Sequence, residues 1–214
     1  MLKQAFALFV LAAGAPLASW ADLVTNGGFE TGDFTGWMLG GNSGFGIGVC
    51  ASGTSFYGSL CTANTGNDAA ALGPPYTTAT LSQSIATTPG ALYTLTFYVR
   101  NDNLLQTPSN AFTASWGGAT VFSESNAADS GYTKETIAGL TATSSSTVLQ
   151  FTFFNTPGGF YLDDVSVVDP PGGGVPEPGS FASLAAGLLV VLATRRRIPT
   201  LLPQAVRLSR RANP

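Results

Sequence analysis

Histidine is absent from the 214 residues, and charged residues make up only 10% of the chain. The absence of histidine excludes catalytic triads with an imidazole base, zinc sites ligated by histidine, and histidine-based pH switches. Cysteine occurs twice, as Cys50 and Cys61, which is too few for a site of four thiolates. A Gly-x-x-x-x-Gly-Lys-Ser/Thr phosphate loop is also missing. The chain therefore lacks the residues on which several common classes of enzyme depend.

The few charges are distributed unevenly. Residues 1–21 contain a single cation, residues 22–169 contain 11 acidic side chains against Arg100 and Lys134, and residues 170–214 contain one acidic side chain against six arginines. These counts correspond to net charges of +1, −9 and +5, in agreement with the overall −3. An acidic body with two cations is unsuited to nucleic acid, whose phosphates require clustered lysine and arginine.

Residues 1–21 have the layout of a secretory signal peptide. Lys3 precedes an apolar run at residues 5–13, and Ser19 and Ala21 place small side chains at positions −3 and −1 of a cleavage site. We expect export through the secretory translocon and cleavage by signal peptidase after Ala21. A buried core helix is the alternative.

Export would place the body of the protein in an oxidising compartment. We therefore expect Cys50 and Cys61 to form a disulfide that closes a short loop rich in glycine and serine. The alternative is a pair of unpaired buried thiols.

The C-terminal region begins with a Pro/Gly linker at residues 170–180, which has no core-forming side chains. Residues 181–194 are uncharged, and Arg195, Arg196 and Arg197 follow directly. An apolar run that ends in cations predicts a single membrane helix whose arginine end stays in the cytoplasm. The run is shorter than the roughly 20 residues of a full span, although arginine side chains can extend to the membrane interface.

The order of these parts carries a family resemblance. Val175, Pro176, Glu177 and Pro178, followed by the apolar run and the arginines, resemble the PEP-CTERM sorting signal of Gram-negative bacteria. The resemblance implies export, transient anchoring in the inner membrane, and an exosortase as partner. That membrane cysteine protease would release the body or transfer it to the cell surface or extracellular matrix. The basic cytoplasmic tail is expected at residues 195–214, and its last part, residues 198–214, departs from the family, whose chains usually end soon after the arginines.

The body, residues 22–169, shows the alternation of β-strands and no useful stretch with a helical period. Side chains of alternating character predict strands over residues 81–85, 91–100, 111–116, 120–124, 132–138, 147–154 and 160–168. Short strands that are separated by glycine and proline turns, without helices between them, predict an all-β antiparallel sandwich or jelly roll.

The two ends of the body carry a second resemblance. Residues 23–37, LVTNGGFETGDFTGW, and residues 160–168, FYLDDVSVV, resemble galactose-binding-like jelly rolls, which include carbohydrate-binding modules of the CenC type. The resemblance implies a structural calcium ion that joins the first and last strands. Glu30 and Asp163 or Asp164 would be its side-chain ligands, because calcium prefers carboxylate and carbonyl oxygens. The alternative is that these are ordinary surface or turn acids.

Carbohydrate binding requires exposed aromatic rings, against which sugars stack their apolar faces. Trp116, Tyr76 and Tyr57 lie in or beside predicted loops and are the candidate sugar contacts. The candidate polar partners are Asn101, Asp102, Asn103 and Gln106. Packing in the core or in a loop is the alternative for every aromatic ring, and it is the expectation for Trp37.

These patterns together predict an exported, surface-sorted, non-catalytic protein that binds exopolysaccharide or associates with extracellular matrix. One alternative is a secreted glycoside hydrolase, for which Glu30 and Asp33 are a conceivable pair of acids. Another is a structural surface protein without a ligand.

Overall fold

The computed structural model describes residues 21–73, 77–103, 109–156 and 158–169. The chain divides into two units, residues 1–173 and residues 174–214, and every described residue belongs to the first. The predicted signal peptide up to residue 20, the linker, the membrane helix and the basic tail lie outside the described residues. Among the residues that are described, no helix has the length and apolar character needed to cross a membrane.

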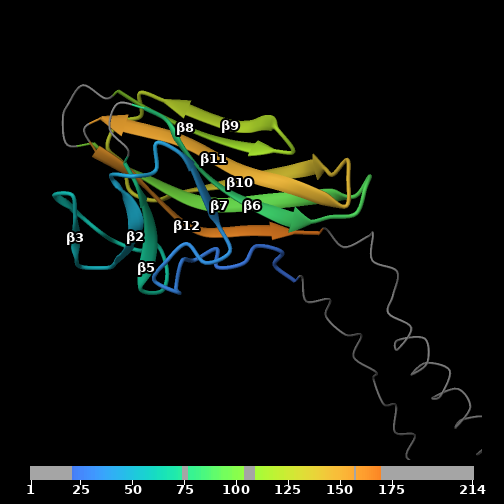
Figure 1. The fold of residues 1–214 in the computed structure, drawn as a ribbon, viewed down its shortest axis with the longest axis horizontal. Helices are drawn as coiled ribbons and strands as arrows, with labels where there is room; N and C mark the ends of the chain where they lie inside the picture. Colours follow the sequence, from blue (N-terminus) through green and yellow to red (C-terminus); the bar gives the residue numbers. More distant parts are fainter. Residues whose placement is uncertain (1–20, 74–76, 104–108, 157, 170–214) are drawn as a thin grey trace, which may run out of the picture. The chain divides into compact units, whose positions relative to one another are not determined.

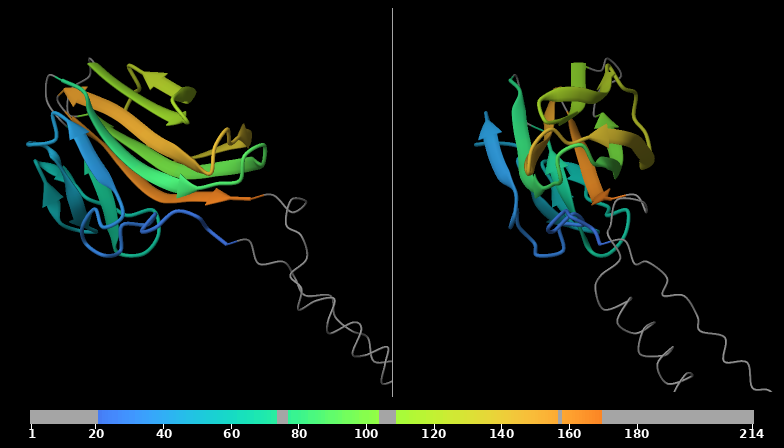
Figure 2. Two further views of the ribbon diagram at one scale, coloured as in Figure 1. Left: turned by 45° about the vertical axis from the view of Figure 1, so that its right-hand side comes forward. Right: turned by 90° about the vertical axis from the view of Figure 1, so that its right-hand side faces the viewer.

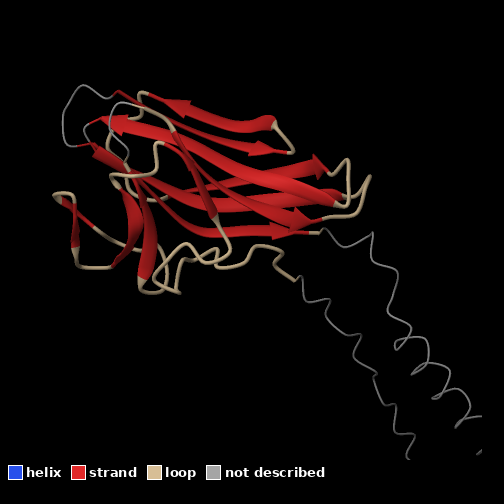
Figure 3. Cartoon of the chain, viewed as in Figure 1, coloured by secondary structure: helices blue, strands red, loops and turns tan. Residues whose placement is uncertain are grey.

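The regular elements of the described body are all β-strands (Figure 3). They are β1 (Met38–Gly41), β2 (Ile47–Ala51), β3 (Ser55–Phe56), β4 (Ser59–Leu60), β5 (Asp68–Leu72), β6 (Ala79–Ala86), β7 (Leu92–Asn103), β8 (Ser109–Trp116), β9 (Ala119–Ser125), β10 (Thr133–Thr141), β11 (Ser146–Thr156) and β12 (Gly158–Val168).

Ten of these strands form two antiparallel sheets, ordered β1-β6-β11-β8-β9 and β10-β7-β12-β5-β2. The two sheets lie face to face as the layers of a sandwich (Figures 1 and 2). Strands β3 and β4 pair only with each other and form a small hairpin. The architecture confirms the all-β antiparallel sandwich that the sequence predicts.

The core between the sheets follows the predicted alternation. Tyr93, Leu95, Phe97 and Val99 of β7 are all buried, and their neighbours in sequence are more exposed. The ring of Phe97 also lies edge-on to that of Phe151 on the opposite sheet, with 5.3 Å between centroids. Such aromatic contacts across the sandwich add to the stabilisation that comes from burying apolar surface.

All of the predicted strands are present, with ends that differ by a few residues. The five strands between residues 38 and 72 were not predicted. Strand β5 is the clearest case, because Ala70 and Leu72 face the main core while Ala71 faces a second buried cluster with Cys50 and Cys61. A strand that is buried on both faces has no alternation to detect.

Candidate functional site

The first resemblance motif in the body forms a compact loop that is organised by one asparagine. Asn26 adopts a left-handed backbone conformation (φ 54°), which asparagine tolerates better than most residues. Its Nδ2 donates hydrogen bonds to Thr31 Oγ1 and to the backbone oxygens of Asp33 and Thr35. Trp37 is buried, as expected, and its Nε1 donates to the backbone oxygen of Asn26 at 3.1 Å. The residues of the motif therefore stabilise the conformation of this loop.

This loop presents Glu30 to the β4–β5 loop, residues 61–67. Glu30 Oε1 accepts the backbone N–H groups of Asn67 at 2.8 Å and Asp68 at 3.0 Å. A Cβ atom at Gly66 would lie 2.2 Å from the same oxygen, and Gly66 has φ 65°, so only glycine suits the position. The hydrogen bonds from Asp68 and Asn67 lower the pKa of Glu30, because they favour its ionised form.

The two aspartates of the closing strand hold the same loop from the other side. Asp163 is fully buried, and its Oδ2 accepts the backbone N–H groups of Asn64 at 2.7 Å and Thr65 at 3.3 Å. Asp164 accepts a hydrogen bond from the Asn64 amide and another from the Thr65 hydroxyl. Burial raises the pKa of Asp163 to about 6, against the effect of its hydrogen bonds.

The structure thus brings the three predicted calcium ligands to one loop, but as they lie here they do not fit a calcium ion. Calcium takes about six to eight oxygen ligands at short range. Among the described residues, no three Asp, Glu, His or Cys side chains are grouped so that they could hold a metal. Oε1 of Glu30 and Oδ2 of Asp163 accept backbone N–H groups of the loop instead.

Glu30 and Asp33 also lack the electrostatics of a glycosidase pair. In such a pair one carboxyl group must have a raised pKa so that it can donate a proton to the leaving group. Hydrogen bonds from Thr35 and Thr31 lower the pKa of Asp33, and the pKa of Glu30 is lowered as well. The arrangement therefore argues against a hydrolase that uses these two acids.

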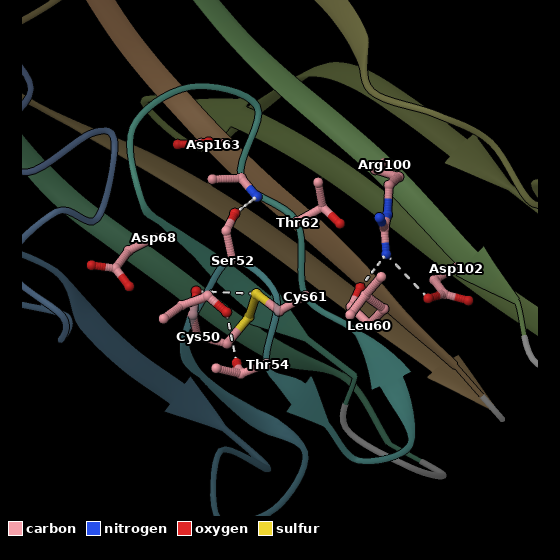
Figure 4. Close-up of a disulfide and its surroundings, with 12 residues drawn as sticks. Cys50, Ser52, Thr54, Leu60, Cys61, Thr62, Asp68, Arg100, Asp102 and Asp163 are labelled. Atoms are coloured by element: carbon pink, nitrogen blue, oxygen red, sulfur yellow. Dashed lines mark hydrogen bonds and ion pairs between the residues drawn. A yellow bond between two sulfur atoms is a disulfide. The ribbon is translucent and has the colours of Figure 1, made fainter.

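The predicted disulfide joins Cys50, at the end of β2, to Cys61, just after β4. It closes the segment that contains the β3–β4 hairpin (Figure 4). On β7 of the same sheet as β2, Arg100 donates to the backbone oxygen of Leu60 at 2.9 Å and pairs with Asp102 at 3.1 Å. The hairpin is therefore attached to the face of the second sheet that points away from the main core.

The three candidate sugar contacts differ in their exposure to solvent. Trp116 is buried, donates from Nε1 to the backbone oxygen of Thr141, and packs against Tyr93, so it cannot stack on a sugar. This corrects the expectation for Trp116, which lies at the end of a buried strand and not in an open loop. Tyr76 lies outside the described residues. Tyr57 is 58% exposed at the tip of the β3–β4 hairpin and remains a candidate.

Two of the four candidate polar partners, Asn101 and Asp102, are engaged within the protein, whereas Gln106 and the side chain of Asn103 lie outside what the structure describes. Asn101 is buried, and its Nδ2 donates to the backbone oxygens of Ala127 and Ala128. Asp102 forms the ion pair with Arg100. The sequence placed both after a predicted strand, whereas β7 continues through them and turns Asn101 into the core.

Two aromatic residues that were not predicted stand beside Tyr57. Phe45 is 56% exposed, and its ring centroid lies 4.7 Å from that of Tyr57. Phe56 lies edge-on to Tyr57, with 4.8 Å between centroids. The glycine-rich stretch around Phe45 gives no periodic signal, so only the tertiary structure could bring these rings together.

The sorting motif lies outside the described residues, and sequence comparison addresses it directly. Residues 174–197 match the family model of the PEP-CTERM protein-sorting motif. The match includes residues 175–178 and the arginines at 195–197. The chain thus carries a PEP-CTERM sorting motif behind its β-sandwich. No curated protein sequence matches the chain.

Solved structures resemble the body. The structure described as TmCBM61 in complex with β-1,4-galactotriose is 17% identical, with a TM-score of 0.54, and the match covers 70% of this chain and 99% of that one. A family 16 carbohydrate-binding module is 16% identical, with a TM-score of 0.46, over 69% and 100%. A CBM4 structure is 18% identical, with a TM-score of 0.44, over 69% and 99%. The likeness to the first of these, with its TM-score of 0.54, shows that the body has a sandwich fold like that of a carbohydrate-binding module.

Proposed function

We propose that this protein is exported, sorted to the cell surface and there binds polysaccharide or associates with extracellular matrix through its β-sandwich, without catalysis. The observation that carries the proposal is the combination of a PEP-CTERM motif at residues 174–197 with a body that resembles a galactotriose-binding module in fold. The motif supports passage through the inner membrane of a Gram-negative bacterium, and the fold supports sugar as the ligand class.

The chemistry of the sorting segment agrees with processing by an exosortase. Pro176 and Pro178 disfavour helix and central strand, and so keep the segment extended for a protease cleft. The uncharged run at residues 181–194 would hold this segment at the membrane, with the arginines at 195–197 on the cytoplasmic side. Exosortase then acts on the chain after the translocon and signal peptidase have acted on residues 1–21.

Fractionation of cells with and without the exosortase tests the sorting part of the proposal. We expect the body at the surface or in the medium of the parent strain, and the unprocessed chain in the membrane fraction of the deletion strain. A Pro176→Ala, Glu177→Ala, Pro178→Ala triple variant should be retained in the parent strain as well. Removal of residues 198–214, which lie outside the matched motif, is the control and should leave sorting intact. An unchanged distribution in the deletion strain would contradict the proposal.

One assay on residues 22–173 distinguishes binding of polysaccharide from its hydrolysis. These residues contain the complete described sandwich with its own core and belong to a self-contained unit. We expect retention on insoluble polysaccharide without release of reducing sugar ends. Release of reducing ends would favour the hydrolase alternative, and failure to bind any polysaccharide would leave only a structural role at the surface.

A further inference from the structure

A pocket of about 230 Å³ lies at one end of the body, next to the β3–β4 hairpin. Its walls come from the loop before β2, the hairpin, the end of β5 and the residues on either side of the β11–β12 turn. None of the described lining residues carries a charge, and four of them are aromatic: Phe45, Phe56, Tyr57 and Tyr161.

The aromatic wall of the pocket is fixed by the sheet beneath it. A Cβ atom at Gly48 of β2 would lie 2.9 Å from Cε2 of Phe56, so the absence of a side chain there lets the Phe56 ring rest on the strand. Phe56 then supports Tyr57, and Tyr57 contacts Phe45. The Cys50–Cys61 disulfide closes the segment that contains this hairpin. The rings are therefore held in place although Tyr57 and Phe45 are more than half exposed.

The backbone conformation of Tyr57 is unfavourable for a tyrosine. Its φ is +46°, in the left-handed region that a bulky residue rarely adopts. Gly58 follows with φ +89°, which glycine adopts without strain. Glycine would also adopt the φ of position 57 without strain, so the turn itself does not require tyrosine there. A strained residue that exposes a large ring at a pocket points to a role for the ring itself.

Beside the pocket, at the lining residue Asn155, lies a buried hydrogen-bond acceptor that has no partner among the described residues. Asn155 is buried and donates from Nδ2 to Asn101 Oδ1 at 2.8 Å, while its own Oδ1 has no partner among the described residues. An unpaired buried acceptor is unfavourable, and a hydroxyl donor that reached it would remove that cost. Apolar walls beside an unused acceptor suit a ligand that has both C–H faces and hydroxyl groups, which is the chemistry of a sugar ring.

Charge restricts the kind of sugar. The lining is neutral, and residues 22–169 around it carry 11 acidic side chains against two cations. A uronate or sulfated chain would be repelled by this field and would find no cation in the pocket. The volume is also below the roughly 300–1,000 Å³ of sites for drug-sized ligands, so it suits one sugar unit and not a long stretch of chain.

We propose that this pocket binds one uncharged pyranose unit of a polysaccharide, stacked on Tyr57 and Phe45. The assignment rests on the proposed polysaccharide-binding function, which it narrows to one site and to neutral sugars. The proposal requires that affinity for the polysaccharide depends on the rings of Tyr57 and Phe45 and not on other exposed apolar side chains of the β3–β4 hairpin.

The test uses residues 22–173 in affinity electrophoresis through gels that contain neutral galactan, xylan, mannan or β-glucan, with anionic alginate for comparison. Tyr57→Ala and Phe45→Ala should each weaken binding to a neutral polymer by about tenfold or more, as expected for an anchor residue. Tyr57→Phe keeps the ring and should bind like the wild type. Leu60→Ala is the matched control, because Leu60 is 61% exposed on the same hairpin and does not line the pocket.

The possible outcomes distinguish failure of the proposed pocket from failure of the proposed polysaccharide-binding function. Equal binding by the wild type, Tyr57→Ala and Phe45→Ala would overturn the pocket while polysaccharide binding stood. Binding to alginate alone would overturn the assignment to uncharged sugars. Failure of the wild type to bind any polymer would overturn the pocket and the binding function together. Melting temperatures of the variants within a few degrees of the wild type show that altered binding does not come from unfolding.

Discussion

The buried carboxylate of Asp163 accepts the backbone N–H of Asn64 at 2.7 Å, across 99 residues of sequence. This hydrogen bond joins the last strand of the sandwich to the loop that follows the disulfide. With Glu30 on the other side, the loop is held by carboxylates from both ends of the body. The closing strand thus organises the loop that leads into β5.

Asp163 should make the stability of the body depend on pH. Its pKa is about 6 in the folded protein, above the ordinary value of 3.8, so the folded state binds the proton more tightly than the unfolded chain. The stabilisation from protonation is therefore fully present below about pH 3.8 and is lost as the pH rises through 6. We expect the free energy of unfolding, measured with urea, to increase as the pH is lowered from 7.5 to 5.

The pKa of Glu30 is lowered, so the stability that it contributes is lost only as the pH falls towards its folded value, below 4.5. The interval from pH 5 to 7.5 therefore excludes Glu30 and reports on Asp163 together with Glu124, whose pKa is raised by burial and by the nearby charge of Glu135. Asp163→Asn should lower stability and flatten the pH dependence in that interval. A slope that is the same in the variant as in the wild type would assign the titration to another group.

Chelation should leave the body as stable as before. Backbone N–H groups already satisfy the oxygens of Glu30 and Asp163, so a divalent cation would have to displace them. We expect the melting temperature of residues 22–173 to be the same in EDTA and in millimolar calcium. A calcium-dependent rise that is lost in Glu30→Gln would show that the loop rearranges to form a metal site.

Loss of the disulfide should destabilise the body measurably. The Cys50–Cys61 bond spans 11 positions, and a bond across so short a loop contributes about 2–4 kcal/mol, mainly by restricting the unfolded chain. The Cys50→Ala, Cys61→Ala double variant should unfold at lower urea concentration by a corresponding amount. Addition of reductant is the companion measurement: it should lower the wild type towards the variant and should not affect the variant.

Two adjacent glycines of the first motif should respond very differently to alanine. A Cβ atom at Gly27 would lie 1.9 Å from the backbone oxygen of Val165, so backbone atoms of the closing strand would have to move. Gly27→Ala should cost about 3 kcal/mol. At Gly28 the nearest atoms are side-chain atoms at 3.7 Å, and Gly28→Ala should change stability by less than about 0.5 kcal/mol. Similar losses in both variants would contradict this explanation of the motif.

The sequence predicted those parts of the fold in which one face of a strand is buried and the other is not. Phe151 and Phe153 of β11 alternate with more exposed residues, and the pattern identifies both the strand and its inner face. The same logic fails for β5, where Ala70 and Ala71 are buried on opposite sides because the disulfide-linked hairpin covers the outer face. A pattern of exposure cannot be detected in a strand that has no exposed face.

For the candidate site, the sequence identified the residue types but not their partners. It placed Glu30, Asp163 and Asp164 together through family resemblance. The structure shows that Glu30 and Asp163 accept backbone N–H groups, whereas Asp164 accepts hydrogen bonds from side chains. It gave equal standing to Trp116 and Tyr57, although one is buried and the other exposed. Burial of a single aromatic residue depends on what the other sheet places against it, and no local pattern encodes that.

The sequence by itself determined the PEP-CTERM sorting motif, the β-sandwich class and the disulfide pair, because a motif of ordered parts, strand alternation and a single pair of cysteines can all be recognised along the chain. The signal peptide stays a prediction. The tertiary structure alone decided which loop the three carboxylates hold and which rings gather at the β3–β4 hairpin. Those contacts join Asn64 to Asp163 and Phe45 to Tyr57, across chain segments that only the stacking of the two sheets and the attached hairpin bring together.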